Sequence, residues 1–235
     1  MNSLVIIPCY NEAKNIRELI ETLLIIDKSI DILIIDDGSP DRTDDVVKSR
    51  FAFHARVNIM CRLRKMVRGS AILDGFTWAL EKGKYEKIVE MDADFSHDPK
   101  ELPKLLEASK IADVVIGSRY LPNSRIIGCS TIRRLFSRFS NFYARILLKI
   151  PIHDYTSGYR VYSISAVKSL ERKAISSRGY IVLSAIAYQL FKKGFLFIEV
   201  PIIFINRRRG KSNLKVVELI DAFTGILKIR FATKV

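Results

Sequence analysis

Short apolar runs that alternate with helical patterns constrain the fold of this chain more than any other feature of its sequence. The runs at 4–8, 31–37 and 113–117, and the run that begins at Ile88, are almost continuously apolar. Such runs are typical of strands that are buried on both faces of a sheet. Between the first two, residues 11–24 carry apolar side chains at helical spacing. The alternation predicts an α/β fold, with a mostly parallel central sheet and helices on both of its faces.

Further elements complete this series and then give way to a less regular second half. Up to Arg119 we expect helices at 43–51, at 69–81 and from Pro99, and a strand at 57–61. Beyond Arg119 we expect a helix at 131–149, a polar turn at 153–160, a helix at 177–193, a strand–turn–strand at 195–205 and an amphipathic helix from 214 to about 231. No internal repeat or low-complexity linker divides the 235 residues, which predicts a single domain.

Polar residues follow four of the apolar runs, at 8–12, 36–39, 92–94 and 117–119. In an open parallel sheet the carboxyl ends of the strands meet at one edge, and ligands bind there. We therefore expect these four tips to lie together. No G-x-G-x-x-G follows the first run and no P-loop is present, which argues against a dinucleotide-dependent dehydrogenase and against a phosphate site built from a glycine-rich loop.

Asp92 and Asp94 form the centre of the predicted site. The apolar run from Ile88 leads into them, and Pro99 ends the stretch. If the strand continues through both, their side chains point to the same side, because residues two apart in a strand share a face. Two carboxylates suit a hard divalent cation that also takes phosphate oxygens from a substrate. An isolated Asp-x-Asp is common by chance, and a solvated strand end is the alternative interpretation.

Charge divides the sequence into two unlike halves. Residues 1–118 carry 17 Lys and Arg against 20 Asp and Glu, a net charge of −3, whereas residues 119–235 carry 22 against 5, a net charge of +17. The basic half can face nucleic acid or an anionic membrane, or it can be a solvated surface. The apolar stripe flanked by arginines at 131–149 can be a core face or an amphipathic element at a membrane interface. No known nucleic-acid-binding motif is present, and we expect no nucleic-acid partner.

Three further features bear on the setting of the protein. Cys9, Cys61 and Cys129 are odd in number, widely separated and without a C-x-x-C pair, which predicts a reducing compartment and no structural zinc. The N-terminus lacks the pattern of a secretory signal. The longest uncharged apolar run, 180–191, is shorter than the roughly 20 residues that span a bilayer. We therefore expect any contact with a membrane to be peripheral.

Six motifs recur in order from residue 4 to about residue 214, over nearly the whole chain. They are Pro8-Cys-Tyr-Asn-Glu12, Asp36-Asp-Gly-Ser-Pro-Asp41, Met91-Asp-Ala-Asp-Phe-Ser-His97, Gly117-Ser-Arg-Tyr120, Thr156-Ser-Gly-Tyr-Arg160 and Glu199-Val-Pro201. Each is weak alone, but the ordered set resembles glycosyltransferase family 2, and within it the polyprenol-phosphate (dolichol-phosphate) mannose synthases. The resemblance implies a GT-A fold, with a Rossmann-like sheet, as a single catalytic domain over 1–235. It divides this domain into a nucleotide-sugar half at 1–118 and a basic half at 119–235 that faces the acceptor and the membrane.

The resemblance also assigns roles by position in these motifs. A Mg²⁺ or Mn²⁺ ion is expected at Asp92, Asp94 and Ser96, and the phosphate of the lipid acceptor at Arg119, Arg133 and Ser137. The catalytic residues are expected to be Asp94, Arg119 and Asp154. The nucleotide sugar is expected to contact Pro8, Tyr10, Glu12, Ile35, Asp37, Asp92, Ala93, Asp94, Arg119, Arg207 and Asn213.

The implied reaction moves a hexose, mannose in those synthases, from a nucleotide sugar to polyprenol or dolichol phosphate with inversion at the anomeric carbon. A phosphate monoester is largely dianionic at neutral pH, so this acceptor needs no strong general base. Asp154 is the one candidate for such a base, and its alternative interpretation is a turn residue that accepts hydrogen bonds from backbone amides. The resemblance implies peripheral attachment to the cytoplasmic face of a membrane, with a small membrane-embedded subunit as a further partner.

Three departures from the family pattern leave alternatives open. The usual Gln-x-Glu of the later helix reads Leu183-Ser-Ala185, and an expected lysine is Asn213, although Lys211 and Lys215 are close by. The glycine-rich loop before the third helix reads Met66-Val-Arg-Gly69, with fewer glycines than usual. The chain could therefore be a family 2 enzyme with another donor, such as UDP-glucose, or a non-catalytic subunit that keeps the fold.

Overall fold

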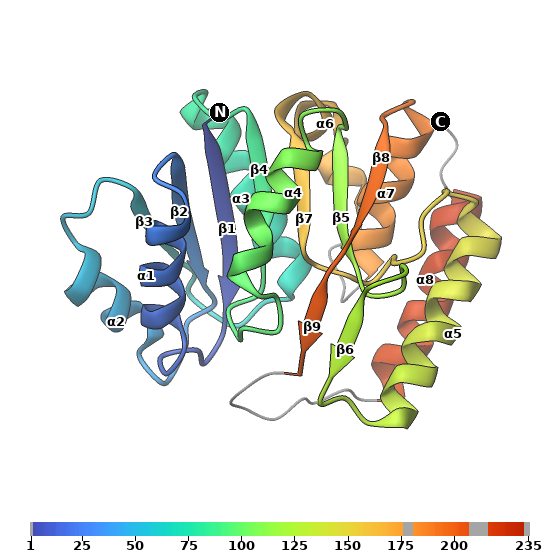
Figure 1. Ribbon diagram of the computed structural model, residues 1–235, viewed down its shortest axis with the longest axis horizontal. Helices are drawn as coiled ribbons and strands as arrows, with labels where there is room; N and C mark the ends of the chain where they lie inside the picture. The colour runs from blue at the N-terminus through green and yellow to red at the C-terminus, as the bar shows by residue number, and fades with distance from the viewer. Residues whose placement is uncertain (1, 176–180, 207–215, 233–235) are drawn as a thin grey trace.

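The computed structural model describes residues 2–175, 181–206 and 216–232, and a seven-stranded sheet forms their centre (Figure 1). Its strands, in spatial order, are β3 (Val57–Cys61), β2 (Ile30–Asp36), β1 (Ser3–Cys9), β4 (Lys87–Glu90), β7 (Arg160–Ser163), β5 (Val114–Ser118) and β8 (Phe197–Pro201). Within this sheet β7 pairs antiparallel with both neighbours, and the other pairs are parallel. The predicted mostly parallel sheet is confirmed. It takes strands from both halves of the sequence, which form one sheet.

Helices cover both faces of the sheet, as predicted, and each face has its own apolar core. On one face lie α1 (Ile16–Ile26), α2 (Thr43–Phe51) and α4 (Leu102–Ala108), which follows the 3₁₀ turn η1 (Pro99–Glu101). On the other lie α3 (Arg68–Lys82), α6 (Ile164–Ser169) and α7 (Ile181–Lys192). Two long helices, α5 (Thr131–Leu148) and α8 (Val216–Ala232), pack against each other beyond α7, and a 3₁₀ turn, η2 (Arg172–Ala174), follows α6 (Figure 1).

The second half contains two strands that the sequence did not reveal. The predicted polar turn at 153–160 leads directly into β7, which inserts between β4 and β5. The predicted strand–turn–strand is confirmed as β8 and β9 (Ile203–Ile205), but β9 leaves the main sheet and pairs with β6 (Arg125–Ile127) in a second, two-stranded sheet. β7 pairs with β4 and β5, which lie far from it in the sequence, so no local pattern marks this strand. The predicted helices at 177–193 and 214–231 correspond to α7 and α8, and their expected first residues lie outside the described residues.

The expectation that Asp92 and Asp94 share one face of a strand is wrong. β4 ends at Glu90, and both aspartates lie in the turn that follows. Phe95 has a φ of 59° there, a left-handed conformation that reverses the chain. The Asp94 carboxylate accepts hydrogen bonds from Ser96 N at 3.0 Å and from Ser96 Oγ at 2.5 Å, which fixes the turn from within. The turn, rather than strand periodicity, therefore sets the direction of these carboxylates.

Candidate active site

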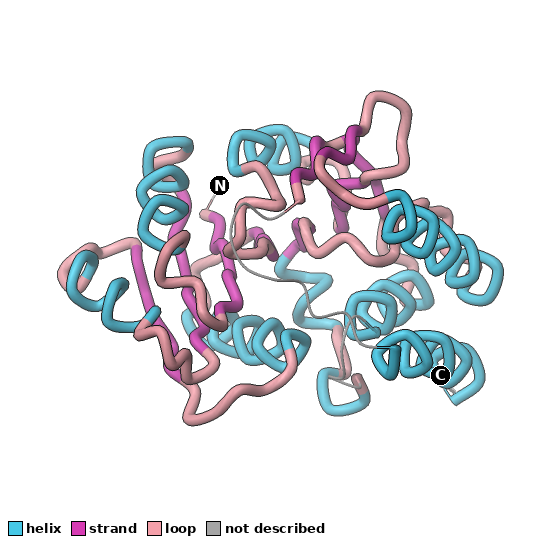
Figure 2. Tube along the Cα trace, turned by 90° about the horizontal axis from the view of Figure 1, so that it is seen from below, coloured by secondary structure: helices cyan, strands magenta, loops and turns pink. Residues whose placement is uncertain are grey.

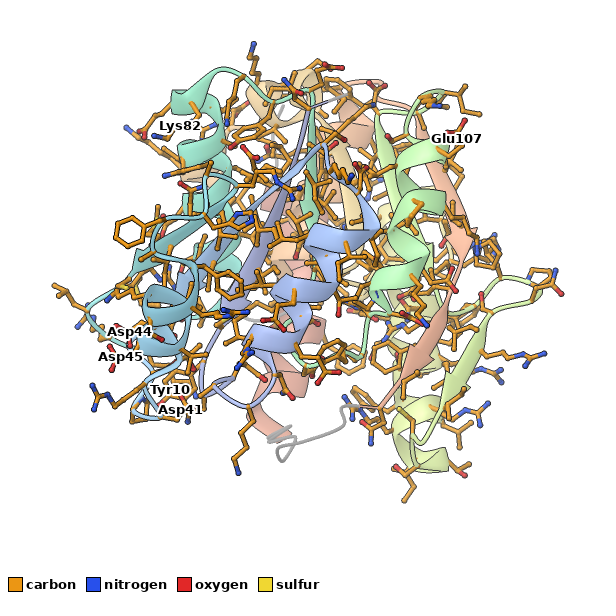
Figure 3. All side chains as sticks on the ribbon, turned by 60° about the vertical axis from the view of Figure 1, so that its left-hand side comes forward. Tyr10, Asp41, Asp44, Asp45, Lys82 and Glu107 are labelled. Atoms are coloured by element: carbon orange, nitrogen blue, oxygen red, sulfur yellow. The ribbon has the colours of Figure 1, made fainter. Side chains whose placement is uncertain are left out.

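The loops that follow β1 and β2 lie side by side at the carboxyl edge of the sheet, which Figure 2 views from below. Asn11 N donates to Ser39 Oγ at 3.0 Å, and Glu12 N donates to Thr43 Oγ1 at 3.0 Å. Ala13 N donates to Asp41 Oδ2 in the same way, and Figure 3 shows Tyr10 and Asp41 at this corner. Short side chains therefore hold the first two strand tips together, as the sequence predicted.

The polar residues expected to bind the nucleoside already have protein partners. Arg62 Nη2 lies 2.5 Å from Asp37 Oδ1, and both side chains are nearly buried. Met66 N donates to the other oxygen of Asp37 at 3.1 Å. The ring of Tyr10 lies 4.0 Å from Lys65 Nζ, a cation–π contact. The loop before α3 is thus tied to the tip of β2 by a buried ion pair.

The apolar residues of that predicted set differ in their surroundings. Pro8 is half-buried and pairs in register with Ile35 across β1 and β2. The side chain of Ile35 is fully buried in the core, and Ala93 is buried as well. Pro8 and Ile35 therefore lie at the same level of the sheet, and they differ in that only the side chain of Ile35 is fully buried.

Beyond the tip of β4 lies a small cavity of about 60 Å³, which we call the carboxylate cavity. It brings together side chains from elements that are far apart in the sequence: the turn after β4, the start of α3, the tip of β5, α5, the loop before β7, α7 and β9. The residues that line it are Arg68, Asp92, Asp94, Ser96, His97, Arg119, Arg133, Thr156, Gly158, Leu183, Phe204 and Asn206. All three residues expected to bind the metal, and two of the three expected to bind the acceptor phosphate, are in this set.

Arg68 contacts two carboxylates at the end of β4. Its Nη2 lies 2.6 Å from Asp92 Oδ1, its Nε donates to the same oxygen at 2.7 Å, and its Nη1 lies 2.5 Å from Glu90 Oε1. Burial alone would lower the pKa of Arg68, but the Asp92 and Glu90 carboxylates outweigh burial and raise that pKa above its ordinary value. Glu90 is 0% exposed, while the Asp92 side chain is 32% exposed. Arg68 therefore connects a buried carboxylate to one that faces the cavity.

The donor atoms around this cavity fit a divalent cation of the Mg²⁺ or Mn²⁺ type. Asp92, Asp94 and Ser96 supply oxygen ligands, which such ions prefer. Among the described residues, no three His, Cys, Asp or Glu side chains come together in a way that could hold a metal ion by themselves. An ion here would need further oxygens from a ligand, which is the usual situation for Mg²⁺ bound to substrate phosphates.

His97 supports the turn from behind. It is 2% exposed, its ring stacks on Tyr159 at 5.0 Å, and its Nδ1 accepts a hydrogen bond from Asp92 N at 3.1 Å. Burial lowers the pKa of His97 below its ordinary value, so the ring is neutral and can accept that hydrogen bond. His97 thus positions the backbone at Asp92.

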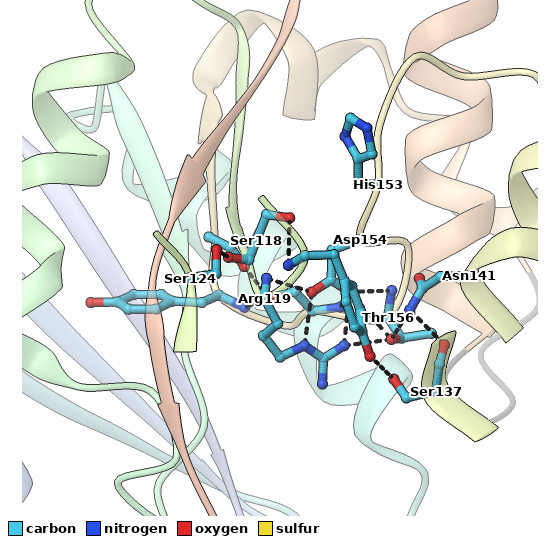
Figure 4. A network of polar contacts seen from close by, with 12 residues as sticks. Ser118, Arg119, Ser124, Ser137, Asn141, His153, Asp154 and Thr156 are labelled. Carbon is cyan, nitrogen blue, oxygen red and sulfur yellow. Dashed lines mark hydrogen bonds and ion pairs between the residues drawn. The ribbon is translucent and has the colours of Figure 1, made fainter. Parts of the chain in front are cut away.

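Arg119 and Asp154 form a bidentate ion pair at the tip of β5 (Figure 4). Arg119 Nε lies 2.7 Å from Asp154 Oδ2, and Arg119 Nη2 lies 2.7 Å from Asp154 Oδ1. Asp154 is fully buried and also accepts hydrogen bonds from Arg119 N, Thr156 N and Ser157 N. Burial alone would raise the pKa of Asp154, but Arg119 outweighs it and lowers that pKa. This geometry favours the turn-residue interpretation of Asp154 over that of a general base.

Two charged residues, Glu199 and Arg160, hold the loop that carries Asp154. Glu199, from β8, accepts hydrogen bonds from Asp154 N at 2.9 Å and from His153 N at 2.8 Å. Arg160 is 0% exposed and donates to the backbone carbonyls of Ser157, Leu183 and Tyr155, each at 2.8 Å. The motifs around residues 156–160 and 199–201 therefore act as a scaffold for the loop.

Two of the residues expected to bind the acceptor phosphate lie in the first turns of α5. Arg133 lines the carboxylate cavity and its Nη1 donates to Asn206 Oδ1 at 3.0 Å. Ser137 does not line the carboxylate cavity, and its Oγ accepts a hydrogen bond from Tyr120 OH at 2.6 Å. A second cavity of about 380 Å³ adjoins this region, and Arg119 lines both cavities.

Some predicted site residues lie outside the described residues, and some residues of the cavity were not predicted from the sequence. Arg207 and Asn213 are outside the described residues. Leu183, where the family has a polar residue, lines the carboxylate cavity with an apolar side chain, and Ala185 is buried. Arg68 was not predicted, although a charged residue inside a glycine-poor version of the loop at 66–69 was a signal that could have found it.

Comparison with known proteins identifies the family. The family model described as "Glycosyl transferase family 2" matches residues 4–171. The chain belongs to glycosyltransferase family 2.

Two curated relatives extend this match beyond residue 171. The undecaprenyl-phosphate mannosyltransferase of Micrococcus luteus is 38% identical over 214 residues, which cover 91% of this chain and 88% of the relative. The polyprenol monophosphomannose synthase of Mycolicibacterium smegmatis is 39% identical over 214 residues, which cover 90% of this chain and 80% of the relative. This chain is accordingly a glycosyltransferase.

Solved structures show that this family 2 chain has the GT-A fold. Glucosyl-3-phosphoglycerate synthase from Mycobacterium tuberculosis, in complex with Mn²⁺, uridine diphosphate and glucosyl-3-phosphoglycerate, has a TM-score of 0.69 and 17% identity, and the match covers 98% of this chain and 79% of that one. The complex of the same enzyme with Mn²⁺ and UDP-glucose has a TM-score of 0.68, with 17% identity, over 98% and 78% of the two chains. At this identity the likeness concerns the fold alone.

Proposed function

We propose that this glycosyltransferase moves a hexose, mannose as in the names of its curated relatives, from a nucleotide diphosphate sugar to the phosphate of a polyprenol. One observation carries the proposal: the carboxylate cavity joins Asp92 and Asp94 to three guanidinium groups, those of Arg68, Arg119 and Arg133. Two carboxylates that can hold a cation, next to arginines that can hold phosphates, suit a reaction between two phosphate-bearing substrates.

Arg119 and Arg133 approach the two substrates from different sides. Arg119 is fixed by Asp154 and faces both cavities, so it lies where donor and acceptor meet. Arg133 approaches from α5, on the acceptor side, and Ser137 follows one turn later. We assign the acceptor phosphate to Arg119, Arg133 and Ser137, because guanidinium groups match phosphate oxygens in charge and geometry.

The reaction we derive needs orientation more than proton transfer. A phosphate oxygen of the acceptor attacks the anomeric carbon, the bond from this carbon to the donor diphosphate breaks, and the nucleoside diphosphate leaves with the electron pair. The attacking oxygen is already anionic, so no side chain has to remove a proton. This agrees with the burial of Asp154 and with the apolar Leu183 and Ala185. Attack from the side opposite the leaving group inverts the anomeric centre.

A divalent cation bound to Asp92, Asp94 and Ser96 would offset the negative charge of the leaving diphosphate. The donor nucleoside is assigned to the edge formed by the loops after β1 and β2, with Pro8, Tyr10, Glu12 and Asp37. In this proposal residues 1–118 form the nucleotide-sugar half of one domain, and residues 119–235 form the acceptor half.

A donor panel tests the proposed function. Purified protein is incubated with radiolabelled GDP-mannose, UDP-glucose or other nucleotide sugars, with Mn²⁺ and undecaprenyl phosphate, and lipid-linked label is measured. Transfer from one donor, dependent on both lipid phosphate and cation, is the expected result. The alternative, a non-catalytic subunit, predicts no transfer from any donor. If no nucleoside diphosphate raises the melting temperature in the presence of Mn²⁺, nucleotide binding itself is excluded at the concentrations tested.

We also propose that α5 rests on an anionic membrane surface. Its outer face carries an apolar stripe whose members are all at least half exposed, which does not agree with a core face: Ile132, Leu135, Phe139, Phe142 and Ile146. Arg134, Arg138 and Arg145 stand beside this stripe and line the 380 Å³ cavity. An apolar stripe with flanking cations matches a lipid interface. None of the described helices is both long enough and apolar enough to span a bilayer.

Flotation with vesicles tests this part of the proposal. The protein should float with vesicles that contain phosphatidylglycerol at low salt, and less with pure phosphatidylcholine. The same stripe is where a small membrane-embedded subunit would dock, and binding to protein-free vesicles would show that attachment does not need one. The three cysteines are free, which agrees with a reducing, cytoplasmic side of the membrane.

A further inference from the structure

Arg68 contacts one carboxylate oxygen of Asp92 inside the carboxylate cavity. Nε and Nη2 both approach Asp92 Oδ1, at 2.7 and 2.6 Å, and Asp92 is one of the residues that would bind a metal. A guanidinium and a divalent cation cannot both take the same carboxylate oxygen at full strength. The structure therefore places an internal positive charge in competition with an external one.

Arg68 also takes up space in the carboxylate cavity, whose volume is about 60 Å³. Arg68 enters the cavity from the first turn of α3 and is 23% exposed, so it is the side chain whose movement away from Asp92 would enlarge the cavity on the carboxylate side.

The two contacts of Arg68 are unequal in how easily they can be broken. Glu90 is fully buried, and its described partners are Arg68 Nη1 at 2.5 Å and Tyr162 OH at 3.2 Å. Leaving that carboxylate without a cation would be costly. Asp92 is 32% exposed and faces the cavity, where ligand charges can replace the guanidinium. Arg68 can therefore remain on Glu90 while it gives up Asp92.

The surrounding backbone makes room for this guanidinium. Gly158, in the loop before β7, lies so close to Arg68 that a Cβ at position 158 would collide with Nη2. Nη2 is buried and makes no well-aligned hydrogen bond to a described residue, although it contacts Asp92. Once Asp92 is released, this N–H group would be able to donate to a phosphate oxygen.

We infer that Arg68 is a displaceable counter-ion of Asp92: it suppresses metal binding in the free enzyme and makes the divalent cation and the donor diphosphate bind together. This inference rests on the proposed function, since the displacing ligand is the metal-bound diphosphate of the donor. Its consequence is a coupling between the two ligands. Binding of nucleoside diphosphate should tighten the cation, and the cation should tighten the nucleoside diphosphate by the same factor.

The test measures Mn²⁺ dissociation constants from the electron paramagnetic resonance signal of free Mn²⁺, without nucleotide and with saturating GDP or UDP. The main variant is Arg68→Gln/Glu90→Gln, which removes the buried pair without leaving Glu90 unpaired. Its matched control is Glu90→Gln, which keeps Arg68 on Asp92. Without nucleotide, the double variant should bind Mn²⁺ about tenfold more tightly than the control, because a hydrogen bond between charged groups no longer competes for Asp92.

The coupling between Mn²⁺ and nucleotide should weaken in the double variant. In the wild type, nucleotide should tighten Mn²⁺ binding strongly, and in the double variant this gain should fall by about the same tenfold factor. Arg68→Lys keeps one positive charge but loses the forked geometry of the guanidinium, so its gain in Mn²⁺ affinity on nucleotide binding should lie between those of the wild type and the double variant. This variant remains informative if the double variant unfolds.

Two results separate this inference from the proposed function. If the wild type binds Mn²⁺ with nucleotide but the double variant matches Glu90→Gln within twofold, and Arg68→Lys matches the wild type, the inference is overturned and the proposed function stands. If neither the wild type nor any variant binds Mn²⁺ or nucleotide, the proposed function fails and the inference fails with it.

Discussion

The two sides of the site treat charge in opposite ways. On the donor side, carboxylates are paired inside the protein: Asp37 with Arg62, and Asp92 with Arg68. On the acceptor side, the side chains of Arg134, Arg138 and Arg145 make no ion pair or hydrogen bond to any described residue. The first arrangement fixes side chains before a ligand arrives, and the second leaves cations available to an anion from outside.

This difference agrees with what each side binds in the proposed function. A nucleotide sugar is a compact polar molecule, and a pair that stays in place, such as Asp37 with Arg62, positions it with little loss of side-chain entropy on binding. A lipid surface is extended and variable, and long exposed arginines next to an apolar stripe can adapt to it. Arg119 lies between the two, since it is held by Asp154 and lines both cavities.

The strongest test of the donor side is Asp94→Asn. It keeps the shape of the turn, since an amide oxygen can still accept from Ser96, but it removes a negative charge from the predicted cation site. We expect kcat/KM to fall by about a thousandfold, the upper range for losing one electrostatic contact to a developing charge. The rise in melting temperature caused by Mn²⁺ with nucleoside diphosphate should also disappear.

Asp98→Asn is the matched control for this change. Asp98 lies four residues further along, and its carboxylate caps η1 by accepting from Lys100 N. Asparagine caps equally well, so activity should change little. Equal losses in both variants would mean that the turn, and not the carboxylate of Asp94, is what matters.

Asp154→Asn tests a buried, bidentate ion pair within the basic half. Removing the carboxylate leaves Arg119, which is 13% exposed, without its bidentate partner. The free energy of unfolding at neutral pH should fall by about 3 kcal/mol. Because the folded pKa of Asp154 is lowered, its contribution is present above about pH 4 and is lost as the pH falls through the folded pKa.

Urea denaturation at several pH values checks this prediction. The gap in stability between wild type and variant should be full at neutral pH and should narrow as the pH falls below 4. Asp113→Asn is the control, because that carboxylate accepts hydrogen bonds from Ser163 Oγ and Leu196 N and forms no ion pair with a described residue. A gap that stayed constant from neutral to acidic pH would contradict the assignment of a lowered pKa to Asp154.

The exposed arginines of α5 allow a test of the acceptor side. The triple change Arg134→Ala, Arg138→Ala and Arg145→Ala should weaken binding to phosphatidylglycerol vesicles by roughly thirtyfold, somewhat less than about 1 kcal/mol for each residue would give. The Mn²⁺-dependent melting shift with nucleoside diphosphate should stay the same, because none of the three lines the carboxylate cavity.

Charge-matched changes on the other half serve as the control. Lys28, Lys82 and Lys110 are exposed in residues 1–118. Their triple alanine variant lowers the net charge equally, and vesicle binding should hardly change. If both triple variants lost the same affinity, net charge and not the face of α5 would explain attachment.

The sequence predicted the donor side better than the acceptor side, for a physical reason. Strands such as β1 and β2 are buried on both faces and carry their polar ligand residues at the tip, so local apolar patterning locates both the strand and the site. The insertion of β7 and the pairing of β6 with β9 depend on contacts between distant segments, which no local pattern records.

The same limit applies within the site. The spacing of Asp92 and Asp94 predicted that their carboxylates lie together, and both line one cavity. Strand periodicity gave the wrong reason for this, because the chain turns after Glu90. Arg68 reaches Asp92 from a different helix, 24 residues away in the sequence. A charged residue in the loop at 66–69 was visible, but its partner was fixed only by the packing of α3 beside β4.

The smallest predicted effect lies at the boundary between the two sides. Tyr120 OH donates to Ser137 Oγ at 2.6 Å, which turns the Ser137 hydroxyl hydrogen away from Tyr120 and leaves it available to an acceptor phosphate. Tyr120→Phe removes this hydrogen bond and should reduce transition-state stabilisation by about 1 kcal/mol, which lowers kcat/KM for the lipid acceptor a few-fold. KM for the nucleotide sugar should stay constant, because the carboxylate cavity is lined by neither residue. A rise in the donor KM of the same size would mean that Tyr120 supports Arg119, whose guanidinium lies 5.6 Å from its ring, instead of the acceptor site.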